Sequence, residues 1–134
     1  TAWTGRLAKE QISKLVAMQQ PFFMKVSFHR PHSPYDPPER LLNVTPVPAQ
    51  PPATSDNGWD TDFRYCSTWS DSERWCGEVA EAELNLTRRA YLACVTHVDE
   101  QIGEILKTLE DTGVLNNTFI LFTSDHGDMQ MDHF

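Results

Sequence analysis

The chain has 134 residues, of which 40% are hydrophobic and 22% charged, and its formal net charge at pH 7 is −8. This length and composition predict one folded domain with a hydrophobic core and exclude a disordered chain. Without a basic stripe, nucleic acid is excluded as a partner, and no apolar run approaches the roughly 20 residues of a membrane-spanning helix.

The first 28 residues predict a helix followed by a strand. Residues 7–20 place apolar side chains on one helical face, at Ala8, Ile12, Leu15 and Val16. Thr4 is expected to be the N-cap, and Pro21 to end the helix. Residues 22–28 are rich in aromatic and β-branched side chains and predict a strand.

A proline-rich stretch, residues 33–77, predicts a long irregular insertion that covers a neighbouring surface. Its tryptophans could stack on a sugar ring, although packing within the loop is the favoured interpretation: Trp59, Trp69 and Trp75. Cys66 and Cys76 could form a disulfide in an oxidising compartment. Three N-x-[ST] triplets also lean towards a secreted, lysosomal or periplasmic setting.

The second half predicts a long helix over residues 81–111 and a buried strand over residues 119–123. The helix carries one apolar stripe, formed by Leu84, Tyr91, Val95, Val98, Ile102, Ile105 and Leu109. Gly113 is well placed as the residue that follows its C-cap. Strand, helix and strand in this order favour a parallel strand pair joined by a long crossover helix, which is an α/β arrangement.

Polar residues follow both expected strands. His32 lies between two prolines after the first strand, whereas Asp125 and His126 come directly after the second. Because the carboxyl ends of parallel strands meet at one edge of a sheet, these segments, about ninety residues apart, are expected to share one cleft.

These residues could hold a metal or an anion. Asp125 offers an oxygen ligand suited to calcium or magnesium, whereas the His126 imidazole favours zinc, manganese or iron or acts as a hydrogen-bond donor. The alternative for this pair is a turn in which Asp125 and Gly127 only set the backbone geometry. His32 could act as a general acid or an anion contact, or be a surface histidine in a proline turn.

Three stretches, residues 21–40, 88–106 and 116–133, together resemble a known family. Their sequences PFFMKVSFHRPHSPYDPPER, RRAYLACVTHVDEQIGEIL and NNTFILFTSDHGDMQMDH are similar to the C-terminal part of the catalytic domain of formylglycine-dependent sulfatases, in the alkaline phosphatase superfamily. The iduronate- and choline-sulfatase-like branches are the most similar. The three stretches lie in the family's order and cover about half of the chain.

The resemblance implies that residues 1–134 are part of a large α/β sandwich, the sulfatase catalytic domain. It implies that Asp125 and His126 are ligands of the active-site calcium; many relatives have Asn at the latter position, and either side chain can also reach the substrate's sulfate. His32 resembles the histidine that contacts the sulfate and can protonate the leaving alcohol. The implied substrate is a sulfated small molecule or carbohydrate.

Other family features are missing from this sequence. The C/S-x-P-x-R motif that yields the formylglycine nucleophile is absent, as are the acidic pair and lysines that complete the site. The formylglycine is expected upstream, and the 134 residues alone are expected to be inactive. Two alternatives stay open: a phosphodiesterase or phosphonate monoester hydrolase of the same superfamily, and a non-catalytic truncated fragment. Asp128 and His133 receive no role, and the oligomeric state stays open.

Overall fold

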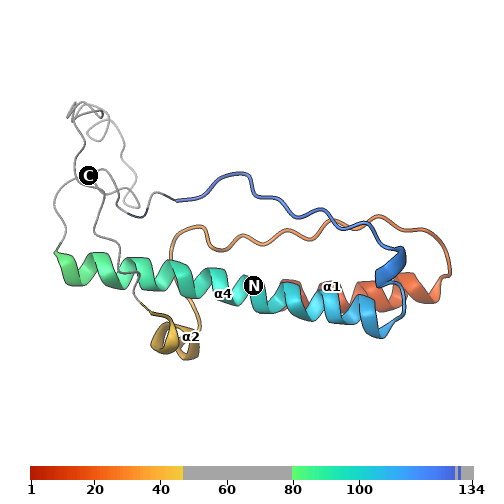
Figure 1. Cartoon of the computed structure of the whole chain (residues 1–134), viewed down its shortest axis with the longest axis horizontal. Coiled ribbons are helices and arrows are strands. Elements are labelled where there is room, and N and C mark those ends of the chain that lie inside the picture. The colour runs from red at the N-terminus through yellow and green to blue at the C-terminus, as the bar shows by residue number, and fades with distance from the viewer. Residues whose placement is uncertain (47–79, 129, 131–134) are drawn as a thin grey trace.

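The computed structural model describes residues 1–46, 80–128 and 130 (Figure 1). The helices are α1 (Ala2–Ala17), α2 (Glu39–Val44), α4 (Glu81–Asp111) and a short 3-10 helix, η1 (Leu115–Asn117). Within the described ranges no strand is formed, and no helix is long and apolar enough to cross a membrane.

Helix α1 packs against α4, and the two helices run in the same direction (Figure 1). Gly5 permits the close approach, because a Cβ atom there would overlap the side-chain amide of Gln101. One turn further along, Lys9 forms an ion pair with Glu104 at 3.0 Å. The buried apolar residues of the helices are few, and half of them are small: Ala8, Ile12, Leu41, Leu84, Ala90, Ala93, Cys94 and Leu109.

The bounds of α1 differ from those predicted. The helix begins at Ala2 with Thr1 as its N-cap, so the prediction of Thr4 as N-cap was wrong. Arg6 lies inside the first turns and forms an i,i+4 ion pair with Glu10, which supports the earlier start. The helix ends at Ala17, before Pro21, because a residue that precedes proline disfavours the helical conformation.

Helix α4 has the predicted bounds, and its end has the predicted geometry. Gly113 adopts a φ of 76°, and the N–H of Val114 donates to the carbonyl of Leu109 at 3.0 Å. This left-handed turn closes the helix as a Schellman motif. The predicted apolar stripe is only partly buried, since Leu109 is enclosed while Val95 is 39% exposed.

The two expected strands are extended but carry no strand pairing in the described chain. Both run back along the helices in the same direction (Figure 1). Along residues 22–28 half-buried and exposed side chains alternate, as one-sided packing against helices requires. Residues 119–123 were predicted to be buried, and this was wrong: all five are exposed, because no described element covers their outer side. The predicted parallel pair therefore stays a prediction.

The region predicted to be irregular contains helix α2. Pro38 precedes it, Glu39 lies in its first turn, and Leu41 is buried where α2 packs on α4. Both flanking features are typical of a helix start, although the surrounding prolines concealed them. Several residues discussed above lie outside the described residues. They are Trp59, Trp69, Trp75, Cys66, Cys76 and His133.

Candidate active site

The loop that carries His32 is held by contacts of its own. The Arg30 guanidinium donates to the carbonyl of His32 at 2.9 Å and forms an ion pair with Asp36. The His32 N–H donates to the carbonyl of His29 at 3.1 Å. These contacts fix the backbone on both sides of the imidazole, so the sequence places His32 on a formed loop.

The turn that carries Asp125 and His126 is more open. One Asp125 carboxylate oxygen accepts the backbone N–H of His126 at 2.9 Å, and Ser124 Oγ donates to the carbonyl of His126 at 2.6 Å. The hydrogen bond from the His126 backbone lowers the pKa of Asp125 below its ordinary value. The side chain therefore stays a carboxylate at neutral pH, as a cation ligand must be.

Both histidines use Nδ1 in the same way. His32 Nδ1 lies 2.8 Å from the carbonyl of Ser33, and His126 Nδ1 lies 3.0 Å from the carbonyl of Gly127. A carbonyl only accepts, so each Nδ1 carries a hydrogen and each Nε2 is left for a ligand. The hydrogen bond to the Gly127 carbonyl, and then the negative charge of Asp125, raise the pKa of His126 above its ordinary value.

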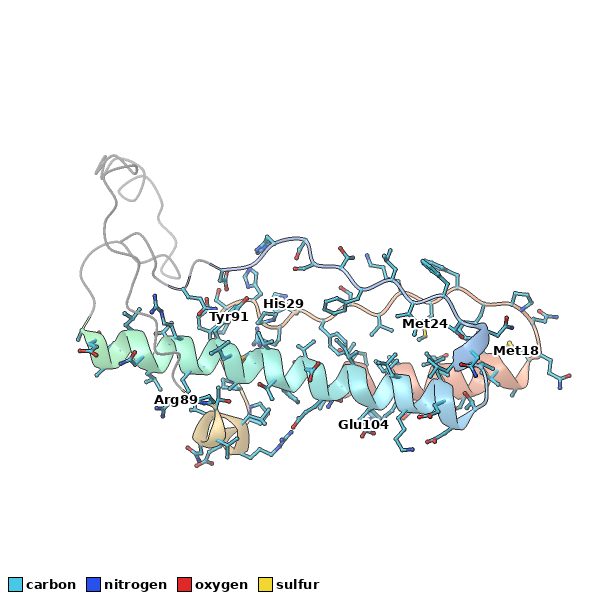
Figure 2. The ribbon with its side chains drawn as sticks, viewed as in Figure 1. Met18, Met24, His29, Arg89, Tyr91 and Glu104 are labelled. Carbon is cyan, nitrogen blue, oxygen red and sulfur yellow. The ribbon has the colours of Figure 1, made fainter. Side chains whose placement is uncertain are left out.

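The structure brings the predicted residues together. The ring centroids of His32 and His126 lie 6.2 Å apart, in an edge-on arrangement. His29 joins them, with its ring 4.9 Å from that of His32, and Figure 2 shows it above the part of α4 that carries Tyr91. Three imidazoles and one carboxylate thus gather at one end of the extended segments, where an anionic group could accept several hydrogen bonds.

A hydrogen bond that the sequence did not predict joins the two loops. The Tyr35 hydroxyl donates to the Asp128 carboxylate at 2.7 Å, and the Tyr35 ring packs edge-on against Tyr91 at 5.4 Å between centroids. Burial, and then the bond to Asp128, raise the pKa of Tyr35 well above its ordinary value. The two partners are 93 residues apart, and no local pattern signals such a pair.

The described residues offer too few donors to hold a metal ion by themselves. Asp125 and His126 offer one carboxylate and one imidazole, and among the residues that the structure describes no group of three or more acidic, His or Cys side chains could hold a metal ion. Calcium takes roughly six to eight oxygen ligands. The donor chemistry of Asp125 fits calcium, but the number of donors requires ligands from elsewhere.

Comparisons with known proteins give a consistent family. A family model described as Sulfatase matches residues 3–133. The chain is 40% identical over 115 residues to an arylsulfatase of Clostridium perfringens, which covers 85% of the chain and 24% of that protein. It is 32% identical over 132 residues to the iduronate 2-sulfatase of Homo sapiens, covering 90% of the chain and 24% of that protein.

A third relative extends the range of named substrates. The choline-sulfatase of Rhizobium meliloti is 32% identical over 118 residues, which cover 83% of the chain and 22% of that protein. The chain spans about a quarter of the length of these relatives.

Proposed function

Because the chain belongs to the sulfatase family, we propose that the natural protein that carries it hydrolyses sulfate esters, with His32, Asp125 and His126 in its active site. The proposed substrates are sulfated small molecules or carbohydrates. The observation that carries the proposal is the 6.2 Å approach of the His32 and His126 rings, each with Nδ1 bound to a backbone carbonyl and Nε2 free to meet a ligand.

His32 is proposed as the general acid. With its Nδ1–H held by the Ser33 carbonyl, the cationic ring has one further proton, on Nε2. When the ester S–O bond breaks, that proton passes to the departing alkoxide oxygen and leaves the neutral ring. The neutral tautomer keeps its hydrogen on Nδ1, the form that the Ser33 carbonyl stabilises.

Asp125 and His126 are proposed as two ligands of a calcium ion. A bound calcium would supply positive charge that polarises the sulfate group. Asp125 keeps one carboxylate oxygen that is not engaged by the His126 backbone, and His126 Nε2 can reach either the ion or a sulfate oxygen. The remaining calcium ligands and the formylglycine nucleophile are proposed to come from residues outside these 134, which alone would be inactive.

The test compares two esters whose leaving groups differ in their need for a proton. In the natural protein, His32→Ala should lower the hydrolysis of an alkyl sulfate about 10²- to 10⁴-fold, because an alkoxide is a poor leaving group. Hydrolysis of nitrophenyl sulfate should fall much less, because nitrophenolate leaves without protonation. His97→Ala is the matched control: this histidine lies on α4, and burial lowers its pKa below the ordinary value.

An equal loss on both esters would contradict the general-acid role of His32. Turnover of a phosphonate monoester or phosphodiester well above that of every sulfate ester tested would instead favour the phosphodiesterase or phosphonate hydrolase alternative. Hydrolysis by the isolated 134 residues would contradict the proposal that the nucleophile lies outside them.

A further inference from the structure

We propose that Tyr35 is a positioning residue: its hydrogen bond to Asp128 holds the His32 loop in register with the Asp125–His126 turn. The inference rests on the proposed sulfate-ester hydrolysis, and it adds a role for two residues that neither the sequence motifs nor the ligand chemistry assigned. Tyr35 lies three residues after His32, and Asp128 lies two residues after His126. A bond between them therefore ties together the segments that carry the two imidazoles.

Within the described residues this bond is the direct polar link between the two loops, while Arg88 of α4 donates to the carbonyl of Gln130 at 3.3 Å and so holds the chain after the turn to the helix. The two extended segments and their loops share no backbone hydrogen bond, and no other side-chain hydrogen bond joins the His32 loop to the turn in residues 1–46, 80–128 and 130. The rings of His32 and His126 touch only edge-on at 6.2 Å, which leaves their separation free to vary. The 2.7 Å contact of Tyr35 with Asp128 is thus the polar link that sets it.

The Tyr35 end of the link is itself anchored. The Tyr35 ring is half-buried and packs edge-on, at 81°, against Tyr91 of α4, so the long helix sets where the hydroxyl points. On the same loop, Arg30 donates to the His32 carbonyl and forms an ion pair with Asp36, which ties residues 30–36 together. Fixing Tyr35 therefore fixes the backbone that presents His32.

The chemical consequence concerns proton transfer rather than binding. A general acid works only when its proton lies within hydrogen-bond reach of the leaving oxygen, and a displacement of about 1 Å can cost about 100-fold in rate. Loss of the link should lower kcat for an alkyl sulfate about 10- to 100-fold while KM changes less than about threefold, because the groups that bind the sulfate remain. Nitrophenyl sulfate should be affected much less.

The experiment uses Tyr35→Phe in the natural protein, with Tyr91→Phe as the matched control. Both substitutions remove one hydroxyl and keep the ring, but the Tyr91 hydroxyl makes no hydrogen bond in the described part of the chain. Asp128→Asn should retain most activity, because the amide oxygen still accepts from Tyr35. Asp128→Ala should match Tyr35→Phe, and the double variant should lose no more than either one.

A second readout needs no turnover. The nuclear Overhauser effect between the His32 and His126 rings, in protein with labelled histidine, should weaken in Tyr35→Phe and persist in Tyr91→Phe. If the wild type hydrolyses no sulfate ester, the proposed function fails, and this ring contact alone decides the positioning role. Unchanged ring contact in Tyr35→Phe, equal losses on both esters, or additive losses in the double variant would overturn it.

Discussion

Helices α1 and α4 enclose side chains between them, whereas the outer side of the two extended segments, residues 22–28 and 119–123, is uncovered in the described part of the chain. We call the first the closed layer and the second the open layer. Between α1 and α4 the side chain of Ile12 has no exposed surface, and Cys94 on α4 is 1% exposed. On the extended segments Phe23 is 93% exposed and Phe119 is 92% exposed. The physical difference is that a helix satisfies its backbone hydrogen bonds internally, while an extended segment needs a neighbouring strand.

The open layer is also the one that carries the candidate site. His32 and the Asp125–His126 turn follow the extended segments directly, at the end where the ring contact occurs. The proposed α/β sandwich would cover the exposed phenylalanines with further strands and bring the remaining calcium ligands to the same edge. The contrast between the two layers therefore predicts where the missing part of the site attaches.

The largest expected effect is on the free energy of unfolding. It is tested with one substitution in each layer, measured both in the 134 residues and in the natural protein. Ile12→Ala should reduce the free energy of unfolding by about 2–5 kcal/mol in any chain that folds, because it leaves a cavity between α1 and α4. Phe119→Ala should change it by less than about 0.5 kcal/mol in the 134 residues but by about 3–5 kcal/mol in the natural protein, where the ring would be covered.

Urea unfolding of both variants, in the 134 residues and in the natural protein, measures these changes in the free energy of unfolding. A similar cost for Phe119→Ala in the two chains would break the contrast between the layers. The 134 residues alone are expected to be marginally stable or to associate through the exposed apolar side, and a monomeric, cooperative transition of the wild type would count against that expectation.

The closed layer was largely predictable from sequence, because helix signals are local. The bounds of α4 and the role of Gly113 follow from periodicity and one glycine, and both were confirmed. The start of α1 was wrong because Thr4 looks like an N-cap, although the structure continues the helix through it to Ala2. Helix α2 was missed because its start signal, Pro38 before Glu39, stands among other prolines.

The open layer was predictable only in part. Extended conformation and the approach of His32 to His126 follow from strand patterns and parallel order, and the structure has both. Strand pairing and burial of residues 119–123 depend on neighbouring segments, and none covers them among the residues that the structure describes. The bond of Tyr35 to Asp128 joins residues 93 positions apart, so only the folded chain reveals it. The roles of His32, Asp125 and His126 stay predictions.

A smaller effect should sharpen the description of the closed layer. Gly5→Ala should destabilise the protein by about 1 kcal/mol, because the overlap with Gln101 outweighs the better helix propensity of alanine. Gly103→Ala is the matched control: a Cβ there meets nothing within 4 Å, so this variant should gain about 0.5–1 kcal/mol. In a Gln101→Ala background the cost at Gly5 should shrink or reverse. Equal thermal shifts for both glycine variants would show that the helices do not pack this closely.

The smallest effect lies in the open layer and depends on pH. The hydrogen bond from Arg30 lowers the pKa of Asp36 below its ordinary value of 3.8 in the folded protein. A carboxyl with a depressed pKa stabilises the fold above its unfolded-state pKa, and that stabilisation is lost as the pH falls through the folded-state pKa. Because the Asp36 side chain is 63% exposed, Asp36→Asn should cost only about 0.2–1 kcal/mol at pH 7.

The difference in unfolding free energy between wild type and Asp36→Asn should vanish below the folded-state pKa of Asp36, and it should shrink in high salt. This weak ion pair also affects the candidate site, because Arg30 donates a hydrogen bond to the carbonyl of His32. Alkyl sulfate turnover should therefore fall more in Asp36→Asn than stability alone suggests, while nitrophenyl sulfate turnover stays near that of wild type. A pH-independent cost, or equal losses on the two esters, would mean that the loop is held by something other than this ion pair.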